Sequence, residues 1–162
     1  MPSSPWAGEK TGPNPTDRAK DGVKRSLLVE GDGLPVGLAV DGANRNAFKM
    51  LEETIQSVPI RRPKPTAKDP QNLCLDKGYD YTEVYELIKE FRFTGHVRAR
   101  GEEAKLIKKR AGFKARRWVV ERTHSGMNRF RRILIRWEKK PENYLAFLHL
   151  VCAIITWRAL RL

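Results

Sequence analysis

Hydrophobic and polar positions follow two different periods along this chain. Short apolar runs on either side of Gly31, Asp32 and Gly33 are typical of a β-hairpin. Elsewhere apolar residues recur every three or four positions, which indicates amphipathic helices. In chain order, the sequence predicts a hairpin at 26–42, a helix at 47–58, a strand running into a turn at 73–81, a helix at 81–91, a strand at 95–100, and helices at 102–112, 116–132 and 141–157.

This order of elements predicts an α/β fold in which helices flank a mixed sheet. A length of 162 residues is enough for one domain with a core and too short for two, so we expect a single domain over 1–162. Residues 1–22 are rich in Pro, Gly, Ser and Asp and predict a loop or disorder. Residues 23–100 carry the hairpin, helix, strand, helix and strand, and 101–162 carry basic helices and the apolar C-terminal helix.

The most apolar segment is 144–157. It is shorter than the roughly 20 residues needed to cross a bilayer and contains His149, so we expect a buried helix with a core histidine. Cys74 and Cys152 lie in apolar runs without metal-binding spacing and are interpreted as small buried residues. The first ten residues lack the apolar stretch of a secretory signal, which favours the cytoplasm.

Positive charge is concentrated in one part of the sequence. Residues 97–140 contain 16 Lys and Arg against 4 Asp and Glu, whereas residues 1–96 contain 14 of each kind. A concentration of this kind creates a field suited to a polyanion, and nucleic acid is the first candidate. A membrane surface fits less well, because Thr123 interrupts the apolar stripe of the basic segment.

Glu121 is the only acid of the basic helix predicted at 116–132. Helical spacing places one apolar stripe on Val119, Thr123, Met127, Phe130 and Leu134. The opposite, cationic stripe consists of Arg117, Glu121, His124, Asn128 and Arg132. Glu121 either pairs with neighbouring arginines or binds a metal ion beside a phosphate backbone. His124 is either a surface histidine or a phosphate contact.

Asp76 is a second isolated acid, directly after the apolar residues 73–75. Asp-Lys-Gly is common turn chemistry, in which the aspartate bonds to local backbone. Ligands of open α/β sheets, however, lie beyond the carboxyl ends of strands, where Asp76 is placed. If Asp76 and Glu121 face one another, their oxygens suit Mg²⁺ or Mn²⁺. Two such ions clamp the attacking and leaving oxygens of a phosphoryl transfer.

Sequence blocks between Gly8 and Trp157 resemble the C-terminal catalytic part of bacterial or archaeal insertion-sequence transposases of the DDE type, which have an RNase H-like fold. The similar blocks, in the same order, are 11–45, 73–81, 116–132 and 136–158. The resemblance implies DNA transposition, with metal-dependent strand cleavage and strand transfer at insertion-sequence ends and Mg²⁺ or Mn²⁺ as cofactor. It implies that Asp76 and Glu121 are the second and third catalytic, metal-binding acids.

The resemblance also implies which residues contact DNA. Arg117 and Glu121 match the arginine and glutamate of a helical signature that contacts the transposon end. The usual tyrosine and lysine positions of that signature hold Lys114 and Asn128. Together with the cationic stripe and the positive charge of this segment, these matches give the residues expected to bind DNA: Arg116, Arg117, Arg122, His124, Asn128, Arg129, Arg131 and Arg132.

The first acid of the family, on the opening strand of the RNase H-like sheet, has no match here. Asp17, Asp32 and Asp41 lie in a loop, a hairpin turn and the GANR block, and none fits. We therefore expect an RNase H-like mixed sheet lacking its first strand, impaired Mg²⁺ or Mn²⁺ binding, and an incomplete copy of a transposase. Unpaired strand edges would favour self-association, for example as a homodimer.

Two functions stay open, because the sequence contains two matching acids and the resemblance requires three. One is DNA transposition, with insertion-sequence ends and target DNA as partners. The other is DNA binding by a non-catalytic remnant. In both cases we expect a cytoplasmic protein without a membrane partner.

Overall fold

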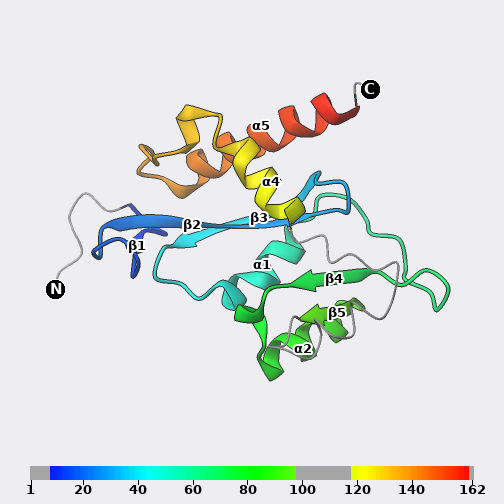
Figure 1. Ribbon diagram of the computed structural model, residues 1–162. Helices are drawn as coiled ribbons and strands as arrows, with labels where there is room; N and C mark the ends of the chain where they lie inside the picture. The colour runs from blue at the N-terminus through cyan, green and yellow to red at the C-terminus, as the bar shows by residue number, and fades with distance from the viewer. Residues whose placement is uncertain (1–7, 98–117, 161–162) are drawn as a thin grey trace. The chain divides into compact units, whose positions relative to one another are not determined.

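An antiparallel hairpin forms the centre of the first of two structural units. The computed structural model describes residues 8–97 and 118–160. The first unit comprises Met1–Pro59 and Val119–Leu162, and the second unit comprises Ile60–Trp118. The strands of the first unit are β1 (Gly12–Pro13), β2 (Asp21–Val29) and β3 (Pro35–Gly42). They form one antiparallel sheet in the order β1-β2-β3, so the predicted hairpin is confirmed (Figure 1).

The turn between β2 and β3 depends on a glycine and an acid. Gly33 has a φ of 93°, which glycine adopts without steric cost. Its N–H donates to the Glu30 carbonyl at 2.9 Å. The Glu30 carboxylate accepts from the backbone N–H groups of Asp32 and Leu34, at 2.9 and 3.2 Å. Glu30 is therefore a structural residue of this turn.

Helices cover both faces of the hairpin. They are η1 (Ala47–Met50), α1 (Leu51–Gln56), α4 (Trp118–Met127), η3 (Arg131–Ile133) and α5 (Pro141–Leu160). Helix α1 lies on one face, where the hydroxyls of Thr54 and Ser26 are hydrogen-bonded at 2.7 Å. Helices α4 and α5 lie on the opposite face (Figure 1). Because alternate strand residues point to opposite faces, even-numbered β2 residues such as Ser26 face α1 and odd-numbered residues face α4 and α5.

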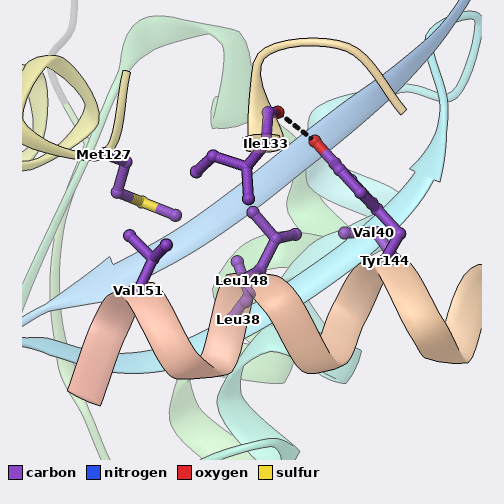
Figure 2. Close-up of a cluster of buried hydrophobic side chains, with 7 residues drawn as sticks. All are labelled: Leu38, Val40, Met127, Ile133, Tyr144, Leu148 and Val151. Carbon is purple, nitrogen blue, oxygen red and sulfur yellow. Dashed lines mark hydrogen bonds between the residues drawn. The ribbon is translucent and has the colours of Figure 1, made fainter. Parts of the chain in front are cut away.

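The core of the first unit lies between the hairpin and α5. Its buried residues are Leu38, Val40, Met127, Ile133, Tyr144, Leu148 and Val151. Tyr144, Leu148 and Val151 project from one side of α5, at helical spacing, into this cluster (Figure 2). The Tyr144 hydroxyl donates to the Ile133 carbonyl at 2.9 Å, so the polar end of this buried side chain is hydrogen-bonded.

The second unit is built on a parallel pair of strands. Its elements are β4 (Asn72–Leu75), η2 (Lys77–Tyr79), α2 (Thr82–Glu90) and β5 (Thr94–Val97). Helix α2 is the crossover that parallel strands require, and it buries Val84 and Ile88. A Cβ atom on Gly95 would lie 3.1 Å from Ile88, so the glycine permits close packing of α2 on β5.

The predicted α/β class is confirmed, but the described strands form two sheets rather than one mixed sheet. The helix expected at 116–132 is also too long, because α4 ends at Met127. Gly126 and Asn128 are poor helix formers, which accounts for the early end. Leu134, expected on the apolar stripe, is consequently 51% exposed.

The expectation of a buried C-terminal helix is wrong. Helix α5 contacts the hairpin through one side only, and His149 is exposed rather than in the core. Its exposed large apolar residues are Phe147, Leu150, Trp157 and Leu160. By length and composition alone α5 could cross a membrane, but core helices meet the same criterion.

The two cysteines were both expected to be buried. Cys74 is exposed, because strand alternation turns Leu73 inward and Cys74 outward. Cys152 is partly buried.

Candidate nucleic-acid and metal-binding residues

Helix α4 is held against the turn between β2 and β3. Thr123 is 4% exposed, and its hydroxyl lies 2.8 Å from the Gly33 carbonyl oxygen. Arg122 donates to the backbone carbonyl of Asp32 in the same turn. These two contacts fix the rotation of α4 about its axis, and they leave Glu121 on an exposed side of the helix.

The two predicted metal-binding acids are both exposed. Glu121 lies in the first turn of α4, in the first unit. Asp76 precedes η2, in the second unit, and its carboxylate accepts from the Lys77 backbone N–H at 2.7 Å. The turn role that the sequence suggested for Asp76 is therefore present.

The chemistry of these acids fits a divalent metal ion, because carboxylate oxygens are the hard ligands that Mg²⁺ and Mn²⁺ prefer. Among residues 8–97 and 118–160, no group of three or more His, Cys, Asp and Glu side chains is arranged to hold a metal ion. The described residues therefore provide oxygen ligands suited to a metal ion, but they do not bring three acidic side chains together.

The arginines expected to contact DNA have different surroundings. Arg129 and Arg131 are exposed. Arg132 forms an ion pair with Glu138, and its guanidinium lies 4.9 Å from the centre of the Phe147 ring. Arg132 thus has structural contacts within the first unit, whereas Arg129 and Arg131 are better candidates for phosphate contacts.

Three further residues expected to contact DNA are either bonded within the first unit or lie outside the described residues. Arg122 is bonded to the hairpin turn, so its guanidinium helps to hold α4. Arg116 and Arg117, together with the helix expected at 102–112, lie outside the described residues.

Arg25, on β2, belongs to this region and was missed in the sequence. Its Nη2 donates to Asn128 Oδ1 at 2.9 Å. Burial and, to a smaller extent, the charge of Arg25 lower the pKa of His124, which disfavours the charged form of its ring. The sequence did contain a signal for this residue. Arg25 lies between Val23 and Leu27, at a position where strand alternation predicts an apolar side chain.

Comparisons with known proteins agree with this chemistry. Residues 2–156 match the family described as the transposase DDE domain. The chain belongs to this family. A transposase described for insertion sequence element IS402 of Burkholderia cepacia is 38% identical over 163 residues, which cover 96% of this chain and 72% of the relative. No solved structure matches the chain.

Membership of the transposase DDE family confirms the resemblance found in the sequence. Domains of this family generally use divalent metal ions, which agrees with the oxygen donors of Asp76 and Glu121. The roles of these two residues as the second and third acids stay predictions.

Proposed function

We propose that this chain acts in DNA transposition as a DDE transposase, which cleaves DNA at insertion-sequence ends and joins them to target DNA. The observation that carries the proposal is the family match over residues 2–156. The relative described as an IS402 transposase and the positive charge of residues 97–140 support it. We place this activity in the cytoplasm, with DNA and without a membrane as partner.

We assign Asp76 and Glu121 to metal binding within an RNase H-like fold. A bound Mg²⁺ or Mn²⁺ would supply a Lewis acid for phosphoryl transfer at a DNA phosphate. Each of these carboxylates would bind a metal ion through hard oxygen atoms. Arg129 and Arg131 would neutralise phosphates beside it, because both are exposed on the same segment after α4.

We propose that metal binding by the described residues alone is weak, because a third acid is needed. An RNase H-like sheet would carry that acid on a strand pairing with β2. Among residues 8–97 and 118–160, this edge of β2 pairs with β1 through Asp21 and Gly22 only, so we propose that another strand pairs with the rest of the edge. Among the nearby acids, Asp32 is a substitute candidate, because its turn is bonded to α4.

Cleavage of DNA carrying the element's ends tests the catalytic proposal. We expect Mg²⁺-dependent nicking that EDTA abolishes and that Asp76→Asn or Glu121→Gln reduces by at least 100-fold. Asp69→Asn is a matched control, because Asp69 is an exposed aspartate of the second unit that has no assigned role. If the full chain binds DNA but never nicks it, adding a strand that carries an aspartate should restore activity. Failure in both forms would favour the non-catalytic remnant.

DNA binding tests the part of the proposal that transposase and remnant share. We expect affinity for duplex DNA to fall steeply with salt, because each phosphate contact releases about 0.9 counterion. Arg129→Ala and Arg131→Ala should each reduce this slope, whereas Arg61→Ala, an exposed arginine of the second unit, should change it little. Salt-independent binding, or equal effects of all three substitutions, would contradict the assignment of the basic surface.

We further propose that the chain self-associates through α5. Phe147, Leu150, Ile154 and Trp157 follow the spacing of a two-helix seam, and three of them are exposed by 37 to 59%. Pairing with the same stripe of a second copy would bury on the order of 1,000 Å² in total, the lower limit for a specific interface. Leu150→Glu should shift sedimentation toward the monomer, and His149→Glu, off the stripe, should not. Equal sedimentation of both variants would contradict the seam.

A further inference from the structure

Arg25 is a cation in a row of β2 that otherwise faces the core. Val23 and Leu27, two positions before and after it, pack against the core cluster beneath α5. Strand alternation places Arg25 on the same face of the hairpin. Its side chain extends to the end of α4, where Nη2 donates to Asn128 Oδ1 at 2.9 Å. A row of side chains that packs against a core rarely contains a charge, so this position calls for a physical reason.

The guanidinium is only partly satisfied by the protein. Its Nη1 atom is buried and has no hydrogen-bond partner among the described residues. Its charge also acts on its surroundings, since it lowers the pKa of His124 and opposes the upward shift that burial causes in the pKa of Tyr144. Because an arginine stays protonated in proteins, the positive charge beside Asn128 is permanent.

The bond to Arg25 also decides how the Asn128 amide is oriented. A guanidinium has donors only, so the amide oxygen must face Arg25 and the Nδ2 group must point the other way. Asn128 is exposed. Arg129 follows it directly, and Arg131 lies two residues after Arg129. An oriented amide donor, a fixed charge behind it and exposed arginines beside it form a set of donors suited to an anion.

We propose that the Arg25–Asn128 pair binds a phosphate group of the DNA backbone. Asn128 Nδ2 donates to a phosphate oxygen, and Arg25 positions the amide and supplies the charge that an asparagine lacks. This inference rests on the proposed DNA-binding function and deepens it, because it adds a positioning residue and a positive charge from β2, outside the basic segment 97–140, to a contact that Asn128 makes.

A purely structural role for Arg25 is the competing explanation. Asn128 follows the C-terminal end of α4, where a helix has partial negative charge, and a cation there stabilises the helix. In that case, replacing Arg25 would lower the stability of the first unit without changing the salt dependence of DNA binding. Salt dependence therefore separates the two explanations.

The test is a fluorescence-anisotropy titration of a labelled duplex at several salt concentrations with the full chain. Losing one phosphate contact should reduce the magnitude of the salt slope by about 0.9 and weaken binding roughly eightfold at about 0.1 M salt. We expect this result for Arg25→Gln and a similar loss of affinity for Asn128→Ala. The loss of affinity in the double variant should be smaller than the product of the losses in the two single variants, because both substitutions act on one contact. Arg25→Lys should keep most of the slope.

Lys24→Gln is the matched control. It removes one positive charge from the adjacent position of β2, but Lys24 lies on the opposite face and donates to the Arg45 carbonyl. We expect this variant to bind like the wild type. If Arg25→Gln does not fold, Asn128→Ala alone decides, because this exposed position tolerates truncation.

The outcomes separate the two levels of the proposal. A wild-type chain that binds DNA without salt dependence would overturn the DNA-binding function and this inference with it. A second outcome would overturn only the phosphate site. In that case the wild type binds DNA as expected and Arg129→Ala weakens binding. A folded Arg25→Gln or Asn128→Ala variant, however, binds with the affinity and salt slope of the wild type.

Discussion

Replacement of Thr123 by valine should weaken the contact that holds α4 on the hairpin. The Thr123 hydroxyl lies 2.8 Å from the Gly33 carbonyl oxygen and 3.0 Å from the Val119 carbonyl oxygen of its own helix. Valine keeps the branched shape but has no hydroxyl. The Val119 carbonyl still accepts the helical N–H bond, whereas the Gly33 carbonyl loses this donor in a buried setting.

The expected cost follows from these contacts. A buried carbonyl that loses its donor costs about 1–3 kcal/mol in the free energy of unfolding. A methyl group must also take the place of a hydroxyl that lies 2.8 Å from the Gly33 carbonyl oxygen, which is closer than a methyl carbon packs against oxygen. We expect a total of about 2 kcal/mol, or a decrease in Tm of about 4–8 °C for a chain of this size. Thr123→Ser keeps the hydroxyl and should cost about 1 kcal/mol, for one lost methyl group.

Urea unfolding followed by far-ultraviolet circular dichroism measures both costs. We expect the valine variant to be less stable than the serine variant, because the hydrogen bond outweighs one methyl group. A Thr123→Val variant that unfolds within about 0.5 kcal/mol of the wild type, or a serine variant that is less stable than the valine variant, would refute this expectation.

Three further predictions follow from buried or charged groups of the first unit and from Cys74. The pKa of His124, followed by NMR, should lie below about 6.5 and rise partway in Arg25→Gln. Because the folded state favours the neutral ring, stability should fall as the pH drops below about 6.5. Cys74 should react with iodoacetamide at pH 8 much faster than Cys152, because burial raises the pKa of Cys152 to about 11; equal rates by mass spectrometry would contradict the burial pattern. Tyr144→Phe should lower the free energy of unfolding by about 1–2 kcal/mol, measured by urea titration, because a buried carbonyl loses its donor.

Local sequence signals predicted the elements that depend on local chemistry. The turn residues around Gly33 predicted the hairpin, and the spacing of Val84 and Ile88 predicted α2. The blocks that resemble DDE transposases identified the family, which the match over residues 2–156 confirms. Asp76 also has the turn role that its neighbours indicate. These features are accessible to sequence reasoning because each depends on residues within a few positions of one another.

Long-range packing decided the rest. The apolar pattern of α5 is nearly the same all round, so it could not reveal that only the side with Leu148 is covered. The charge of the segment put Arg122 among the expected DNA contacts, but its guanidinium is bonded to the hairpin turn, 90 positions away in the sequence. The Arg25 contact joins residues 103 positions apart.

The sequence by itself determined the family, the α/β class and the concentration of positive charge, because these depend on residue order and composition. Only the tertiary structure decided which of the exposed basic residues also make contacts within the first unit, as Arg122 and Arg132 do. It also revealed the role of Arg25. Its position in β2 is one where strand alternation predicts an apolar residue, and its side chain bonds to Asn128 at the end of α4. The physical reason is that a side chain's charge is set by its own chemistry, whereas its partners are set by the segments that fold against it.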